Sequence, residues 1–220
     1  MSAAILAPDL FVRRHTVVAA PPLAPEIRLH LATELAPLWQ ASEEALAQGA
    51  VPPPFWAFAW PGGQALARHL LDHPDLVAGR DVLDFGAGSG LVAIAAAKAG
   101  AARVSAADTD PFAAAAIAAN AALNDVALRV TTADPLAGAA PAGMVVTAGD
   151  VCYEQPMAER AIRWLRRCAE RGSLVLLADP GRAYLPRAGL VERARYPVPT
   201  SREIEDRDRR ETIVWQVLAD

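Results

Sequence analysis

Short apolar runs alternate with alanine-rich stretches along the chain from about residue 81. The runs have the length and composition of buried strands, and the stretches between them are long enough for helices. The expected strands are 81–85, 103–107, 127–132, 144–148 and 173–178. The expected helices are 90–99, 111–123 and 156–171. Apolar strands that alternate with helices predict a parallel sheet covered on both faces.

The pattern changes after residue 190. Residues 190–198 and 211–218 are strand-like, and the charged segment between them has no room for a helix. Two strands joined in this way form an antiparallel pair. Five parallel strands followed by a returning pair predict the α/β, Rossmann-like architecture of class I methyltransferases. This architecture is a mostly parallel seven-strand sheet with a C-terminal antiparallel hairpin.

Residues 1–60 do not follow the alternation of strands and helices. The segment 25–39 contains a short alternating run and then a helical pattern, whereas 51–63 is too rich in proline for either. We therefore expect residues 1–60 to form a lid-like extension, without a second core, on a main domain of residues 61–220.

Composition and charge exclude several classes of function. A chain of 220 residues with 53% hydrophobic content is long enough for one domain with a full core. A net charge of −4 argues against a protein that binds nucleic acid. The two cysteines show no metal-ligand spacing, and the pair His69/His73 at i, i+4 has no third ligand nearby, so no metal site is expected. Without a signal-peptide pattern or an apolar run of about 18 residues, we expect a cytoplasmic monomer with no membrane span.

Three glycines, Gly86, Gly88 and Gly90, stand between the first expected strand and its helix. Glycines at this place permit a tight turn and let the backbone approach a ligand. A dinucleotide fingerprint needs glycine or alanine where this chain has Leu91. The D-x-G-x-G-x-G spacing is instead the first motif of S-adenosylmethionine enzymes. In this reading Asp84 closes the strand, holds the loop and lies near the charged amino-acid portion of the cofactor.

Two further acids follow the next strands. Asp108 ends the second strand about 20 residues beyond the loop, where an acid accepts hydrogen bonds from ribose hydroxyls. Asp110 precedes Pro111 and is expected to cap the next helix. Asp134 follows the third strand, where this fold contacts the adenine amino group, although a turn aspartate is the alternative. NAD stays a rival ligand because it uses the same ribose acid.

The stretch "AGDVCYE" places Asp150 and Tyr153 where a buried strand ends and a helix begins. Ligands bind at this edge of an open α/β sheet. A carboxylate and a phenol there are therefore candidates for the chemistry of the site. In the structural alternative, Asp150 caps the helix expected at 156–171 and Tyr153 only packs.

Several motifs together carry a family resemblance over about residues 5–218. They are "PPPFWAFAWPGGQALARHLLDHP", "VLDFGAGSGLVAIAAAKAGA", "AADTDPFAAAAIAANAALN", "AGDVCYE" and "ADPGRAYLP". In these motifs the chain resembles bacterial relatives of the electron-transfer flavoprotein β-subunit lysine methyltransferase. That family belongs to the seven-strand protein methyltransferases with a D/E-x-x-Y motif, and related sequences are also labelled nicotinamide N-methylases.

The resemblance implies an enzyme that uses S-adenosylmethionine, yields S-adenosylhomocysteine and methylates a lysine of the electron-transfer flavoprotein β subunit. It implies that Asp150 and Tyr153 line the site between the sulfonium and the incoming amine. It also implies that Trp60, in the Trp-Pro-Gly-Gly element, lies beside the cofactor, with Trp56 as a weaker candidate. A small-molecule N-methyltransferase with a nicotinamide-like acceptor is the alternative function, and a cofactor-binding module without catalysis is a third.

Overall fold

The computed structural model describes residues 7–32, 53–200 and 205–220. The helix expected after the alternating run at 25–39 falls outside these residues. The described helices and strands are α1 (Pro8–His15), β1 (Val17–Ala19), β2 (Leu29–Leu31), α3 (Pro61–Asp72), β3 (Asp81–Phe85), α4 (Leu91–Lys98), β4 (Arg103–Ala107), α5 (Pro111–Leu123), β5 (Arg129–Thr131), β6 (Val145–Gly149), α6 (Gln155–Glu170), β7 (Leu174–Asp179), β8 (Leu190–Pro199) and β9 (Arg209–Val217). Short 3-10 helices are η1 (Phe55–Ala57), η2 (Pro74–Leu76) and η3 (Pro135–Ala137).

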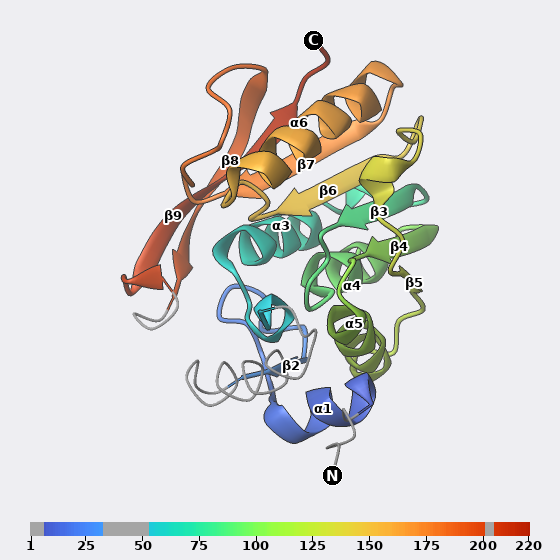
Figure 1. Ribbon diagram of the computed structural model, residues 1–220, viewed down its shortest axis with the longest axis vertical. Coiled ribbons are helices and arrows are strands. Elements are labelled where there is room, and N and C mark those ends of the chain that lie inside the picture. Colours follow the sequence, from blue (N-terminus) through green and yellow to red (C-terminus); the bar gives the residue numbers. More distant parts are fainter. Residues whose placement is uncertain (1–6, 33–52, 201–204) are drawn as a thin grey trace.

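The central sheet has seven strands in the order β5-β4-β3-β6-β7-β9-β8 (Figure 1). The first five are parallel, and β9 lies antiparallel between β7 and β8. The predicted fold class is therefore confirmed. Strand order reverses between β3 and β6, and in open α/β sheets the crevice at this switch point binds ligands.

Alternate residues of each central strand pack against different helices. Along β7, Val175 and Leu177 join the cluster formed with α6, whereas Leu176 and Ala178 join the cluster formed with α3 and α4. Figure 1 shows α6 on one face of the sheet, away from α3, α4 and α5. This period of two explains why the strands read as continuous apolar runs, since both of their faces are buried.

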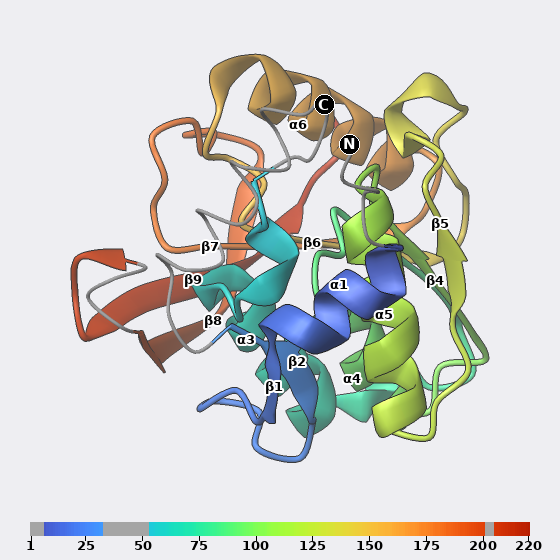
Figure 2. The same cartoon turned by 60° about the horizontal axis from the view of Figure 1, so that its bottom comes forward.

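The described part of the N-terminal extension forms a further layer over the helices. Helix α1 crosses α5, and the hairpin β1–β2 lies beside α4 and α5 (Figure 2). Ile27 and Leu29 pack with Ile94 of α4, and Phe11 packs with Phe112 of α5. Both sides of α4 and α5 are therefore covered, which explains why these alanine-rich helices lack a polar face.

Helix α3 begins in direct contact with the ends of β6 and β7. A Cβ on Gly62 would lie 2.5 Å from the carbonyl oxygen of Ala178 and 2.6 Å from Oδ2 of Asp150. A Cβ on Gly149 would lie 2.9 Å from the backbone nitrogen of Gly63. The two chain segments approach this closely only because Gly62 and Gly149 carry no side chain.

We expect Gly62→Ala to lower the free energy of unfolding by about 1–3 kcal/mol, because the new methyl group overlaps backbone atoms that have no room to move. Gly63→Ala is the matched control, since its Cβ would meet only Leu91 Cδ2 at 3.9 Å. Alanine is also the better helix former, so the control should be as stable as the wild type or more stable. Urea unfolding of both variants measures the difference, and equal losses would contradict the close approach.

Candidate functional site

The glycine loop lies between β3 and α4, at the carboxyl end of the sheet. Gly86, Gly88 and Gly90 have backbone φ angles of 64°, 52° and 80°, a region that favours glycine. A Cβ on Gly90 would lie 3.2 Å from Cγ2 of Ile117 in α5, so the loop also packs tightly against this helix. The conformation predicted for a ligand-binding turn is therefore present at all three positions.

Asp108 ends β4 and contacts the glycine loop directly. Its Oδ2 accepts a hydrogen bond from the backbone N–H of Gly88 at 2.8 Å, and its Oδ1 accepts one from Asp110 N–H at 3.0 Å. Burial raises the pKa of the Asp108 carboxyl above its ordinary value. Asp110 caps α5 through the N–H of Phe112, as the sequence predicts.

Asp84 lies beneath the loop and is buried. Its Oδ1 accepts a hydrogen bond from Thr147 Oγ1 of β6 at 2.8 Å, and its Oδ2 accepts one from the Ala93 N–H in the first turn of α4 at 3.2 Å. Burial is the main cause that raises the pKa of Asp84 to about 7. Asp84 therefore joins two strands to the start of the helix that follows the loop.

Asp134 takes part in a turn and an ion pair. Its side chain accepts a hydrogen bond from the N–H of Leu136 at 2.9 Å and so caps η3. Its Oδ2 lies 3.2 Å from Nη2 of Arg160 on α6. These contacts fit the alternative of a turn aspartate, while a contact with adenine stays a prediction.

Asp150 follows β6 and is the most constrained acid of the site. Its backbone has a φ of 56°, unusual for a residue with a side chain, and its N–H donates to the Ala178 carbonyl at 3.0 Å. Its Oδ2 accepts a hydrogen bond from the Gly63 N–H at 3.1 Å, at the amino end of α3. Its Oδ1 accepts from Nε and Nη2 of Arg182 at 3.2 and 2.8 Å. Only 8% of the residue is exposed.

The alternative in which Asp150 caps the following helix is wrong. Helix α6 has Glu154 at its N-cap, without a side-chain hydrogen bond, and the carboxylate of Asp150 points to α3 instead. Burial raises the pKa of Asp150 to about 6, although the neighbouring Arg182 opposes this rise. The positive end of α3 and the guanidinium favour the charged carboxylate, but burial outweighs both effects and the pKa stays above its ordinary value.

Arg182, in the loop after β7, is held at this site by contacts that the sequence does not reveal. Beyond Asp150, its Nη2 also pairs with Oε1 of Glu205 at 2.8 Å, and Oε2 of Glu205 pairs with Nε of Arg210 at 3.0 Å. The guanidinium carbon lies 5.7 Å from the centre of the Trp60 ring, within the range of a cation–π contact. A chain of alternating charges thus runs from Asp150 through Arg182 and Glu205 to Arg210, at the start of β9.

Aromatic side chains line the mouth of the site. Tyr153 is 46% exposed, and its ring lies 5.5 Å from that of Phe55. The Phe55 ring lies 6.0 Å from that of Trp60, whose indole N–H donates to the Phe55 carbonyl at 2.8 Å. A pocket of about 190 Å³ opens beside them, lined by Tyr153, Pro180, Gly181, Arg182, Ala183 and Arg210.

Trp56 does not line this mouth. It is 1% exposed and packs in the core with Phe11 and Phe112, so the structure does not favour the weaker prediction of a cofactor contact by its side chain. Its backbone passes the glycine loop, since its Cα lies 3.9 Å from where a Cβ of Gly88 would stand.

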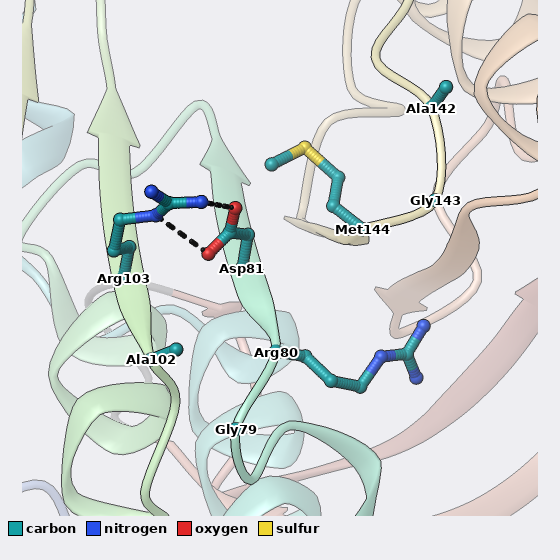
Figure 3. A pocket seen from close by; sticks show the side chains of 8 residues that line it. All are labelled: Gly79, Arg80, Asp81, Ala102, Arg103, Ala142, Gly143 and Met144. Atoms are coloured by element: carbon teal, nitrogen blue, oxygen red, sulfur yellow. Dashed lines mark hydrogen bonds and ion pairs between the residues drawn. The ribbon is translucent and has the colours of Figure 1, made fainter.

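A larger pocket of about 580 Å³ lies at the opposite edge of the sheet (Figure 3). Its lining comes from the amino ends of β3, β4 and β6 and includes an ion pair between Arg103 and Asp81. None of the predicted site residues contributes to it. Position at the carboxyl edge, rather than size, therefore identifies the candidate site.

The described residues contain no helix that is long and apolar enough to cross a membrane. Among the same residues, no group of three or more histidines, cysteines or acids is placed to hold a metal ion.

Comparison with known proteins places this geometry in a family. A family model described as ribosomal protein L11 methyltransferase (PrmA) matches residues 66–148. The electron transfer flavoprotein beta subunit lysine methyltransferase of Xenopus laevis is 38% identical over 94% of this chain and 86% of its own length. The protein of the same name from Danio rerio is 38% identical over 91% of this chain and 79% of its own.

A solved structure supports the fold. Magnesium protoporphyrin IX methyltransferase from Synechocystis PCC 6803, with bound S-adenosylmethionine, matches with a TM-score of 0.52 at 16% identity. The match covers 70% of this chain and 77% of that one. The seven-strand sheet and the glycine loop with its acid at the next strand end define a class I S-adenosylmethionine-dependent methyltransferase.

Within that class, the chain belongs to the family of electron transfer flavoprotein beta subunit lysine methyltransferases. The resemblance found in the sequence motifs is thereby confirmed.

The raised pKa values of the buried acids predict how stability depends on pH. Asp84, with a pKa of about 7, and Asp110 and Asp150, each about 6, bind protons more tightly in the folded than in the unfolded chain. Their contribution to stability is therefore complete below about pH 4 and is lost as the pH rises through about 7.

We expect Asp84→Asn to flatten the fall in unfolding free energy between about pH 5 and pH 7.5, because the amide does not titrate. The amide can accept from the Ala93 N–H and donate to Thr147, whose hydroxyl can reverse its role. Urea unfolding across this pH range measures the slope, with Asp75→Asn at an exposed position as control. A slope in Asp84→Asn equal to that of the wild type would show that Asp84 is not the titrating group.

Proposed function

We propose that this chain transfers a methyl group from S-adenosylmethionine to a lysine of a folded protein, with the electron transfer flavoprotein β subunit as its acceptor. The observation that carries this proposal is the D-x-x-Y pair, Asp150 and Tyr153, beside the glycine loop in a chain whose match to the Xenopus laevis relative covers 94% of its length. A monomer in the cytoplasm stays a prediction from the sequence.

The residues at the carboxyl edge fit the cofactor. A Cβ on Gly88 would meet only the Cα of Trp56, at 3.9 Å, so there is space beside Gly88 in that direction. In this proposal Gly86, Gly88 and Gly90 approach the cofactor, Asp108 accepts from ribose hydroxyls, and Asp134 contacts adenine. Asp84 holds the loop from below, and Trp60 lies beside the donor. When bound, S-adenosylmethionine supplies a methyl group on a positively charged sulfur.

The chemistry required of the protein at the acceptor side is modest. A lysine amine must be neutral to act as a nucleophile, and with a pKa near 10.4 only about 1 in 2,500 is neutral at pH 7. Asp150 attracts the ammonium form, water takes the proton, and the site aligns the lone pair with the methyl carbon. This is mainly catalysis by proximity and orientation.

Tyr153 acts as a neutral phenol in this scheme. Burial and the nearby charges of Glu154 and Asp108 raise the pKa of its hydroxyl above the ordinary value, so it is not a base at neutral pH. Its oxygen can accept a hydrogen bond from the amine, and its ring, with those of Phe55 and Trp60, forms a wall for the thin apolar stem of a lysine.

The alternative acceptor is a nicotinamide-like small molecule. Such a ring needs a closed aromatic pocket, for which Trp56, Phe58 and Trp60 are the candidates. Trp56 and Phe58 are 1% and 4% exposed and belong to the core with α1 and α5. The aromatic groups that do reach the surface are arranged as an open mouth, which favours a side chain delivered by another protein.

Offering both acceptors in parallel with isotopically labelled S-adenosylmethionine tests the proposal. We expect label on lysines of the β subunit and none in methylnicotinamide. Asp150→Asn should slow the transfer at least 10-fold, or about 1.4 kcal/mol, because it removes the charge that attracts the ammonium. Asp81→Asn at the opposite edge of the sheet is the matched control and should retain wild-type activity.

Asp150 also supports the fold, because its loss would remove one of the two acidic partners of Arg182 and the acceptor of the Gly63 N–H. Rates must therefore be compared at a temperature where circular dichroism shows both proteins folded. Tyr153→Phe provides a second variant that removes only an exposed hydroxyl, and it should also be slowed. Label in nicotinamide alone would contradict the lysine acceptor.

A further inference from the structure

Asn120 of α5 connects the N-terminal extension to the glycine loop through one buried side chain. Its Oδ1 accepts a hydrogen bond from the backbone N–H of His30 in β2 at 2.7 Å. Its Nδ2 donates a hydrogen bond to the carbonyl oxygen of Ser89 at 2.8 Å. Asn120 has no exposed surface, so neither bond competes with water.

The Ser89 carbonyl lies inside the loop proposed to hold the cofactor. Its neighbours Gly88 and Gly90 both have positive φ angles. Glycine adopts this conformation readily, but it adopts others as readily. Glycine loses the most backbone freedom on ordering, so a loop of this composition needs bonds from outside to stay in one conformation. The Asn120 amide supplies such a bond and fixes the direction of the Ser89 carbonyl.

A second part of the extension also lies close to the loop. The Cα of Trp56 lies 3.9 Å from where a Cβ of Gly88 would stand, and Trp56 itself packs with Phe11 of α1. Ile117 of α5 lies against Gly90. The glycine loop is therefore held between α5 and Trp56 of the extension, and Asn120 joins α5 to the extension at His30.

Asn124 lies one turn further along α5 and provides a natural comparison. Its Oδ1 accepts from the Arg28 N–H at 3.0 Å, and its Nδ2 donates to the Arg28 carbonyl at 2.7 Å. It thus holds the same extension to the same helix. None of its recorded hydrogen bonds reaches the glycine loop; the remaining one joins its Nδ2 to the Asn120 carbonyl at 2.8 Å.

We infer that Asn120 is a positioning residue for S-adenosylmethionine: it holds the Ser89 carbonyl and so makes the N-terminal extension part of the cofactor site. The inference rests on the proposed role of the glycine loop. It assigns the extension a task at the cofactor, in addition to any contact with the acceptor protein.

The test compares Asn120→Ala with Asn124→Ala in the full-length chain. Urea unfolding without ligand measures the structural cost, which should be similar because each variant loses buried hydrogen bonds to β2 or its flank. Calorimetry with S-adenosylhomocysteine measures cofactor affinity. We expect Kd to rise at least 10-fold in Asn120→Ala and less than 3-fold in Asn124→Ala.

A second pair of variants covers the case in which Asn120→Ala does not fold. Asn120→Asp keeps the shape and can still accept from the His30 N–H, but at pH 9 its ionised carboxylate cannot donate to Ser89. Asn124→Asp is its control on the same helix. The same contrast in Kd is expected at that pH, together with a raised KM for S-adenosylmethionine and little change in kcat.

The possible results separate the inference from the function on which it rests. If the wild type binds S-adenosylhomocysteine but the Asn120 and Asn124 variants have equal Kd values, the positioning role is overturned and the proposed cofactor site stands. Absence of binding by the wild type would instead contradict the proposed cofactor site itself.

Discussion

Burial of the Asp150 carboxylate is the constraint on which the rest of the site depends. A carboxylate away from water needs partners for its oxygens, and Asp150 obtains them from the Gly63 N–H and from Arg182. The first contact requires the start of α3 to lie against the end of β6, which is sterically possible only with Gly62 and Gly149. The second requires the loop after β7 to turn inward, where Glu205 holds the guanidinium of Arg182.

The same junction connects the acceptor side to the cofactor side. Trp60 precedes α3 and stacks on Arg182, while the first turn of α3 contacts Asp150. The glycine loop lies one strand away. Asp84 binds the first turn of the helix that follows the loop, and Asn120 of α5 binds the Ser89 carbonyl within it. Helices α4 and α5 are rich in alanine, whose side chain buries little area. They still hold the loop in place because the extension covers their outer side, so both of their faces make buried contacts.

The features that the sequence predicts correctly are those that local patterns determine. Strand periodicity predicted the five parallel strands and the final hairpin, and the spacing of Gly86, Gly88 and Gly90 predicted the loop. The cap by Asp110 follows from the next two residues alone. The expected strand at 127–132 is longer than β5, which covers Arg129–Thr131, because the flanking residues have little apolar periodicity to mark its ends.

Partners that are distant in sequence could not be predicted in this way. Asp150 and Gly63 are 87 residues apart, and a carboxylate just before a helix reads as the cap of that helix. Arg182 lies 32 residues from Asp150 and 23 from Glu205, so no local pattern indicates its two ion pairs. Trp56 reads as a cofactor contact beside Trp60, whereas the 3-10 turn of η1 directs it into the core.

The most direct measurement for the role of Asp150 is the ratio of kcat/KM in Arg182→Gln to that in the wild type, as a function of pH. Deprotonation of the acceptor lysine affects both enzymes equally, so it cancels from the ratio. Arg182 lowers the pKa of Asp150, which burial raises to about 6, so loss of Arg182 should raise this pKa further. If Arg182 keeps Asp150 charged to attract the ammonium, the ratio should be lowest near pH 6 and should rise toward pH 9. A ratio that does not change with pH would contradict this role.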